Sequence, residues 1–206
     1  MECSSEGLSE QSIDLRSRFL AFTDHARAAL ASLNEDGGDL LGELRHLSKS
    51  FADIARAAST YHLTRLLSPY TGKCNEIFKA VRNLSSTRTG ALIVIQREAS
   101  AEERMTAGIP LGAEITSTLL ESIFNVGSPL HDGAVLIRDD GIVSAANVLP
   151  LTKKVYRTRK MGTRHRAAIG LSEHTDALVF VVSEETGTPS FAFDGFLYPF
   201  YFMDRE

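Results

Sequence analysis

A histidine and an aspartate stand just ahead of a short apolar run in the middle of this chain. The stretch spans residues 128–137 and includes, in order, His131, Asp132, Gly133, Ala134, Val135, Leu136 and Ile137. The β-branched run predicts a buried strand, with the imidazole and the carboxylate at its entrance. Gly133 and Ala134 leave the backbone almost bare, which suits a flat ligand lying on the main chain while the carboxylate reaches its reacting atom. Asp-Gly is also common in ordinary turns, and the stretch alone favours that simpler interpretation.

Cationic side chains gather in a second stretch. Its residues are Gly162, Thr163, Arg164, His165 and Arg166, and small helix-forming residues follow. We expect Thr163 to cap a helix, whose free N–H groups and positive dipole end would bind an anion beside the two arginines. Guanidinium groups match phosphate oxygens better than ammonium groups do. Basic residues usually form a solvated face, but together with the carboxylate turn they favour a phosphate site.

Polar residues also end a later apolar run, which predicts a buried strand over residues 177–183. Ser183, Glu184 and Glu185 come at its carboxyl end, where functional groups gather in α/β sheets. A hydroxyl there can bind phosphate, and a glutamate can ligate Mg²⁺ or Mn²⁺, both of which prefer oxygen ligands. Because successive strand residues face opposite ways, one of the two glutamates should point into a site, and Glu185 is the favoured one.

Composition limits the classes of function. The chain has 206 residues, of which 43% are hydrophobic, and a formal net charge of -4. This content supports a real core, while the charge argues against a general nucleic-acid surface, so phosphate binding should be local. The apolar runs have strand length and the N-terminus is acidic and polar, so we expect no membrane span and no signal peptide. Cys3 and Cys74 lack metal-ligand spacing, which favours reduced thiols and a cytoplasmic protein.

Two helical patterns precede the motifs. Residues 9–34 and 39–67 carry apolar residues at helical spacing, and a turn over residues 34–38 separates them. In the first pattern the apolar residues are Ile13, Leu20, Phe22, Ala26, Ala29, Leu30 and Leu33. In the second they follow the spacing of a coiled-coil seam, and they are Leu40, Leu44, Leu47, Phe51, Ile54, Ala58 and Tyr61. We therefore expect an antiparallel helical hairpin as a domain of residues 1–70, with a role in oligomerisation or regulation, because it carries no catalytic constellation.

The remainder, residues 71–206, should form the catalytic domain. The whole chain should adopt a mixed α/β (α+β) fold. The expected elements are a helix after Gly162, helices over residues 72–86 and 114–126, and strands over 91–96, 134–137, 142–148, 177–183 and 190–194. The polar segment 98–112 should be irregular. The apolar tail from Phe196 contains Pro199 and fits an edge strand. The hairpin should thus be followed by a mixed β-sheet flanked by helices.

Several motifs follow one another along the second half of the chain. They are Gly90–Ile95, the His-Asp-Gly-Ala run, Leu149-Pro150-Leu151, Thr163–Arg166 and Val182–Gly187. In these residues the chain resembles the diadenylate cyclase domain, which condenses two ATP molecules into cyclic di-AMP. The resemblance covers residues 75–195. The helical leading region is similar to that of the soluble, sporulation-associated branch of the family rather than the branch with membrane helices.

The resemblance implies roles for these residues. Asp132 would act at the attacking hydroxyl, directly or through a bound metal, and Gly133 and Ala134 would let the purine and ribose approach the backbone. Leu149 would cover the adenine. The triphosphate would be held by Thr163, Arg164, His165 and Arg166, with the Ser183 hydroxyl able to bind phosphate, and Glu184 would also belong to the ATP site. The Arg-His-Arg group counts with Asp132 as catalytic. The ligands of Mg²⁺ or Mn²⁺ would be Asp132, His131 and Glu185. Packing roles for His131 and His165 stay open.

The expected product has two equivalent halves, while one pocket binds one ATP. Two domains related by a two-fold axis, with facing pockets, would satisfy that symmetry. The resemblance implies the same arrangement in a homo-oligomer, either a dimer of facing active sites or a larger assembly such as a hexamer. Neither nucleic acid nor a membrane is expected as a partner.

Two other functions stay open. One is a nucleotide sensor without turnover, against which the intact Asp132 and Arg164-His165-Arg166 argue. The other is a metal-dependent phosphohydrolase using His131 and Asp132, which is weakened by the lack of further ligands at metal-site spacing.

Overall fold

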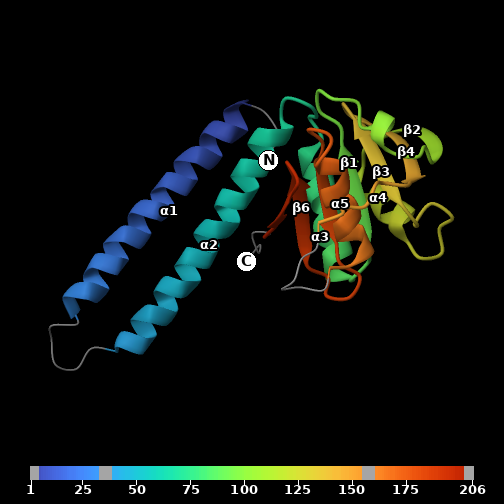
Figure 1. Ribbon diagram of the computed structural model, residues 1–206. Coiled ribbons are helices and arrows are strands. Elements are labelled where there is room, and N and C mark those ends of the chain that lie inside the picture. Colours follow the sequence, from blue (N-terminus) through green and yellow to red (C-terminus); the bar gives the residue numbers. More distant parts are fainter. Residues whose placement is uncertain (1–4, 33–38, 155–160, 202–206) are drawn as a thin grey trace. The chain divides into compact units, whose positions relative to one another are not determined.

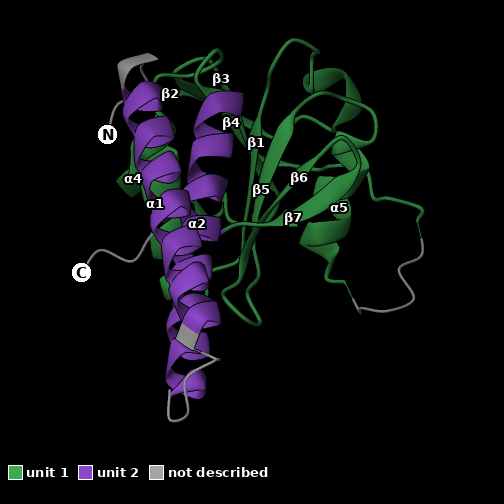
Figure 2. Cartoon of the chain, turned by 90° about the vertical axis from the view of Figure 1, so that its left-hand side faces the viewer, with its two compact units in different colours: residues 1–3, 67–200 green, residues 4–66, 201–206 purple. Residues whose placement is uncertain are grey.

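The computed structural model describes residues 5–32, 39–154 and 161–201, and these residues divide into two compact units. One unit comprises residues 5–66 together with Tyr201, and the other comprises residues 67–200 (Figures 1 and 2). The first unit is built from two long helices, and the β-strands lie in the second. The chemistry-bearing motifs of the sequence therefore all belong to the unit of residues 67–200.

The unit of residues 5–66 is a pair of antiparallel helices, α1 (Ser5–Ser32) and α2 (Leu40–Leu67) (Figure 2). Asp39 stands at the start of α2, where its Oδ1 accepts a hydrogen bond from the backbone N–H of Gly42 at 2.9 Å, as an N-cap does. Phe22 of α1 and Phe51 of α2 contact each other with ring centroids 6.0 Å apart. The predicted helical hairpin is confirmed.

The apolar seam predicted for the hairpin is only partly buried. Ala29 and Ile54 are buried, but six of the predicted seam residues are exposed, namely Ile13, Leu20, Leu30, Leu40, Leu44 and Phe51. With 3.6 residues per turn, Ile13 and Leu20 lie about half a turn round α1 from Phe22, so they face away from α2. Leu33 lies outside the described residues.

The second unit contains a seven-stranded mixed sheet with the strand order β2-β4-β3-β1-β5-β6-β7. Its strands are β1 (Ala91–Ile95), β2 (Ile109–Glu114), β3 (Ala134–Arg138), β4 (Gly141–Asn147), β5 (Leu178–Val182), β6 (Pro189–Phe193) and β7 (Phe196–Pro199). β1 and β3 are parallel, and the other neighbouring pairs are antiparallel. Both β3–β4 and the edge strand β7 lie where the sequence predicts them.

Helices cover both faces of this sheet. They are α3 (Cys74–Ser86), α4 (Ser117–Phe124) and α5 (Thr163–Ser172), with a short 3₁₀ turn over Glu102–Arg104. Val179 and Val181 of β5 belong to the same buried cluster as Ile169 of α5. Phe180, between them, must face the other side, where its ring centroid lies 6.0 Å from that of Phe78 in α3. The two-sided cover explains why the apolar runs of β1 and β5 are buried at every position.

The segment before α4 differs from the prediction. It contains the edge strand β2 instead of an irregular loop, and α4 begins at Ser117 rather than near Glu114. β2 is mostly exposed and its pairing with β4 shifts register after Pro110, so its sequence lacks the apolar alternation of an ordinary strand. Thr116 caps α4 by accepting a hydrogen bond from the N–H of Leu119 at 3.2 Å.

The composition of the chain also leads to predictions about membrane-spanning helices and about the cysteines. In the part of the chain that the structure describes, no helix combines the length and the apolar character needed to cross a membrane. The expectation of reduced cysteines is wrong for Cys74, which is buried and disulfide-bonded. Cys3 lies outside the described residues.

Candidate active site

Strand pairing brings the predicted site segments to one end of the sheet. Ile93 of β1 pairs with Val135 of the parallel β3, Ala134 pairs with Asn147 of β4, and Ala91 pairs with Val182 of β5. The starts of β1 and β3 therefore share one sheet end with the carboxyl ends of β4 and β5. Segments 131–133, 148–152 and 183–185 continue from these strand ends. The sequence motifs, which are far apart along the chain, thus meet at this end.

The backbone at Gly133 is shaped for close approach. Gly133 has a φ of +120°, and a Cβ placed on it would lie 2.7 Å from the carbonyl carbon of Ala146. Since L-residues rarely adopt this conformation and real Cβ contacts are never so short, glycine is required here. The exposed Asp132 is held at the entrance of β3 by this turn, as predicted.

His131 is anchored by its ring. Its Nδ1 lies 2.5 Å from the carbonyl oxygen of Ser128, so Nδ1–H donates this hydrogen bond. In the neutral imidazole the other ring nitrogen, Nε2, then carries a lone pair. A backbone carbonyl that fixes the tautomer in this way is typical of histidines that ligate metals, although it also suits a packing role.

Asn147 positions the start of β3, a role that the sequence analysis missed. It is buried at the end of β4, and its Nδ2 donates to the carbonyl oxygen of Ala134 at 2.8 Å. Its Oδ1 accepts from the backbone N–H of Gly108 at 2.9 Å and from Ser144 Oγ at 3.0 Å. An asparagine inside an apolar strand was the available signal, since a buried amide needs partners.

Helix α5 starts one residue earlier than predicted. Gly162 is its N-cap and makes no side-chain capping bond, so Thr163 is the first helical residue and the prediction that it caps the helix is wrong. Thr163 and Arg166 are exposed, whereas Arg164 and His165 are half-buried. The first turn thus presents its backbone N–H groups beside two arginines, which is the anion-binding arrangement expected from the sequence.

Arg164 joins α5 to the sheet end. Its Nη1 donates to Glu184 Oε2 at 2.5 Å, and the Arg164 side chain is 24% exposed. A Cβ on Gly90, just before β1, would come within 2.6 Å of Nη1, so Gly90 leaves the room that the guanidinium occupies. The sequence predicts only a strand for the motif Gly90–Ile95. The contact with Arg164 explains why the residue before this strand is a glycine.

The segment after β4 is locked to α5. Gly170 of α5 approaches so closely that an added Cβ would lie 2.2 Å from the carbonyl oxygen of Pro150. The backbone N–H of Thr152 donates to the carbonyl oxygen of Arg166 at 3.0 Å, and Arg166 Nη2 donates to the carbonyl oxygen of Thr152 at 3.4 Å. The same contacts place Leu149 in the buried cluster that contains Ala134 and Ala167, with 6% of its surface exposed.

A carboxylate strengthens this lock. Glu173, just after α5, accepts hydrogen bonds from Thr152 Oγ1 at 2.8 Å and from Lys154 Nζ at 3.2 Å. Burial raises the pKa of the Glu173 carboxyl, but the bonds from Thr152 and Lys154 outweigh burial and hold the pKa below its usual value. The loop that carries Leu149 is therefore held most firmly when Glu173 is ionised.

The turn after β5 separates its three polar residues. Ser183 Oγ accepts from the N–H of Thr186 at 3.3 Å, so this hydroxyl supports the turn. Glu184 is turned toward Arg164, and Glu185 is exposed. In the described ranges, no three histidine, cysteine or acidic side chains converge as they would around a metal ion. The predicted set of Asp132, His131 and Glu185 is not brought into contact.

Known proteins share these features. Residues 78–197 match the family model DAC, described as DisA bacterial checkpoint controller nucleotide-binding. The cyclic di-AMP synthase CdaS of Bacillus subtilis is 51% identical over 174 residues, which cover 84% of this chain and 84% of that protein. The diadenylate cyclase CdaS of Bacillus thuringiensis is 47% identical over 167 residues, which cover 81% of this chain and 83% of that protein.

Solved structures extend the similarity to the fold. A Bacillus cereus protein, described as a hypothetical membrane spanning protein, has a TM-score of 0.89 at 42% identity and covers 94% of this chain and 95% of its own. DacA from Staphylococcus aureus has a TM-score of 0.58 at 41% identity and covers 62% of this chain and 85% of its own. The family model matches more than half of the residues and the CdaS proteins match along most of their length, so this chain belongs to the DAC family.

Proposed function

We propose that this chain is a diadenylate cyclase, which joins two ATP molecules into cyclic di-AMP and releases two pyrophosphates. The observation that carries the proposal is the position of the Asp132-Gly133 turn and the Arg164–Glu184 pair at one end of the sheet, in a chain of the DAC family. The relatives named cyclic di-AMP synthase and diadenylate cyclase support the substrate and the product.

The reaction requires a base at the sugar. Each ribose 3′-hydroxyl attacks the α-phosphorus of the other nucleotide, a new P–O bond forms, the P–O bond to pyrophosphate breaks, and the hydroxyl proton leaves. We assign removal of that proton to Asp132, whose carboxylate is exposed at the entrance of β3. The bare backbone at Gly133 and Ala134 lets the nucleoside lie close to that carboxylate. Leu149 contributes to the apolar wall beneath the adenine.

The triphosphate requires cations and N–H donors. Arg164, Arg166 and the first turn of α5 supply them, with Thr163, His165 and Ser183 adding polar contacts. A guanidinium has five N–H donors, so the contact with Glu184 orients Arg164 and still lets it donate to phosphate oxygens. Donors already in place need no reorganisation as charge develops on the phosphate, and this lowers the barrier.

We assign Asp132, His131 and Glu185 as the residues that would hold Mg²⁺ or Mn²⁺. Their carboxylate oxygens suit these ions, and the hydrogen bond of His131 to Ser128 leaves Nε2 as the ligating atom. Glu185 is exposed, so its side chain is able to change rotamer. When bound, such an ion supplies charge neutralisation at the phosphates.

Assembly follows from the symmetry of the product. Two cyclase units with facing pockets, related by a two-fold axis, would each present one ATP to the other. We assign the hairpin of residues 5–66 to a homo-oligomer larger than a dimer, such as a hexamer, which restrains the enzyme by controlling how the pockets meet. The exposed apolar residues of α1 and α2 support this role, since exposed apolar patches mark sites of protein–protein interaction.

One assay tests the activity. The purified chain is incubated with ATP and Mn²⁺, and the products are identified by chromatography and mass spectrometry, with Asp132→Asn as the control for contaminating enzymes. Cyclic di-AMP, absent from the control, is the expected result. ADP or AMP alone would instead assign a phosphohydrolase, and bound but unchanged ATP would assign a nucleotide sensor.

A further inference from the structure

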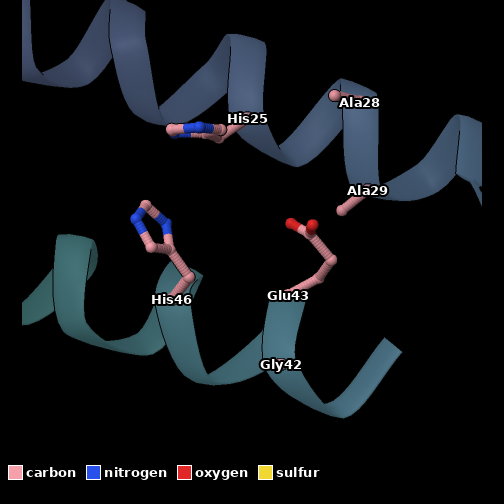
Figure 3. A pocket seen from close by; sticks show the side chains of 6 residues that line it. All are labelled: His25, Ala28, Ala29, Gly42, Glu43 and His46. Carbon is pink, nitrogen blue, oxygen red and sulfur yellow. The ribbon is translucent and has the colours of Figure 1, made fainter. Parts of the chain in front are cut away.

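Two histidines face each other across the helical hairpin (Figure 3). The ring centroids of His25 in α1 and His46 in α2 are 4.8 Å apart, and the ring planes make an angle of 69°. Both side chains are exposed, so water and ions reach them. The catalytic proposal uses neither residue, and both lie in the unit that carries no cyclase motif.

The space beside the pair is not filled by apolar side chains. A cavity of about 480 Å³ is lined by His25, Ala28, Ala29, Gly42, Glu43 and His46. Three of these residues, Ala28, Ala29 and Gly42, have no side chain beyond Cβ, so they leave the space between α1 and α2 unfilled at this level. The Glu43 carboxylate extends into the same space from α2 (Figure 3). One carboxylate and two imidazoles therefore border the same cavity.

The spacing of these groups suits a metal ion. Glu43 and His46 are three residues apart on α2, and a Glu-x-x-His pair that faces another helix is how helical bundles build metal centres. With Zn–N bonds of about 2.0–2.1 Å and near-tetrahedral angles, two imidazoles on one zinc ion have ring centroids roughly 5 Å apart. The observed separation of 4.8 Å is close to this value, so the distance between the two rings is compatible with a shared ion.

We propose that His25, His46 and Glu43 form a Zn²⁺ site that clasps α1 to α2, with water as the fourth ligand. Imidazole nitrogen and carboxylate oxygen are both zinc ligands. The third ligand arrives by a change of side-chain rotamer, because Glu43 is exposed and no three ligands already converge in the described residues. The Asp39 cap holds the first turn of α2, which carries Glu43, and His46 follows in the next turn.

The test is a titration of the full chain with Zn²⁺ by isothermal calorimetry. All samples carry Asp132→Asn, which weakens metal binding at the proposed cyclase site. His25→Gln/His46→Gln removes two ligands, and His62→Gln is the matched control, since His62 is an exposed histidine of α2 outside the cavity. Helical content measured by circular dichroism confirms that each variant is folded.

We expect one Zn²⁺ to bind per chain at the hairpin with an affinity that falls at least about 10-fold in the double variant and is unchanged in His62→Gln. Co²⁺, used as a spectroscopic probe, should give the strong visible absorption of four-coordinate cobalt in the starting protein and lose it in the double variant. Identical isotherms for the starting protein and the double variant would overturn the proposal. The contact between His25 and His46 would then be only an edge-to-face packing of two rings. An equal loss in His62→Gln would overturn the proposal as well.

Discussion

The two units of this chain differ in what they do with their apolar side chains. In the cyclase unit, β1 and β5 are buried at every position between α3 on one face of the sheet and α5 on the other. In the hairpin, Leu20, Leu30 and Leu41 are 61%, 66% and 76% exposed. A unit with a complete core can hold catalytic groups in place by itself, whereas apolar groups in solvent mark a surface that needs a partner.

The polar groups differ in the same way. At the sheet end of the cyclase unit they are fixed by local contacts, such as Asn147 to the carbonyl of Ala134 and Arg164 to Glu184. On the hairpin the ion pairs link residues one turn apart. Arg27 and Asp24, for example, are both exposed, and exposed pairs of this kind contribute little. This difference supports the proposal that the chemistry belongs to the cyclase unit and that assembly belongs to the hairpin.

The largest effect is expected from Asp132→Asn. The amide keeps the shape of the side chain but is neither a base nor a strong metal ligand, so cyclic di-AMP synthesis should fall by at least about 100-fold. ATP binding, measured by calorimetry, should largely survive. Turnover at the wild-type rate would remove Asp132 from the mechanism, and loss of binding together with activity in a folded protein would make its role structural.

Gly133→Ala should damage both the fold and the activity. The left-handed φ and the contact with Ala146 together should lower the free energy of unfolding by about 2 kcal/mol or more. Gly127→Ala is the matched control, because a Cβ there would meet only Asn125 Oδ1 at 3.8 Å. Urea denaturation measures the free energy of unfolding of both variants. Equal values would show that the backbone at the entrance of β3 tolerates a side chain at position 133.

Arg164→Ala and Arg166→Ala should each weaken ATP binding by about 10- to 100-fold, because the lost hydrogen bonds are charge-assisted. Adenosine, which has no phosphates, should bind nearly as well as before. Calorimetric titration with both ligands separates the two cases. If adenosine and ATP lost the same factor, the arginines would be structural and the phosphate site would lie elsewhere.

Glu173→Gln should have the smallest effect. The pKa of Glu173 is lower in the folded state than in the unfolded chain, so its ionised form stabilises the fold above the unfolded pKa, and this contribution disappears as the pH falls through the folded pKa. The variant should lose about 1 kcal/mol at pH 7, and this loss should shrink as the pH falls through the folded pKa of Glu173. A difference that stays constant over this range would assign the effect to packing.

The elements with strong periodic or apolar patterns could be predicted from the sequence. β1 and β5 are unbroken apolar runs, and Asp139-Asp140-Gly141 marks the β3–β4 hairpin, so these were predicted correctly. β2 was missed because an exposed, register-shifted edge strand has no apolar alternation to detect. On the hairpin, the apolar composition predicted the helices correctly but not which residues they bury.

The candidate site could be predicted in its residue types but not in its contacts. The Asp-Gly turn and the Arg-His-Arg stretch stand out by their residue types, and the family resemblance implies their roles. The partners were not, because the fit of Gly90 against Arg164 and the bonds of Asn147 depend on which strands are neighbours in the sheet. The same limit explains why the N-cap of α5 was predicted at Thr163 and is found at Gly162. The exact residue at which a helix begins is decided by the backbone geometry.

The most direct test of the division between the units is to remove residues 1–67 and to measure cyclic di-AMP production per chain, alongside the mass of the protein in solution. The sheet and its covering helices all follow residue 67, so the fragment should fold. We predict that it makes at least as much product per chain as the full chain and forms a smaller assembly. A folded fragment that binds ATP but makes no product, or one that keeps the same oligomer and the same rate, would contradict the account.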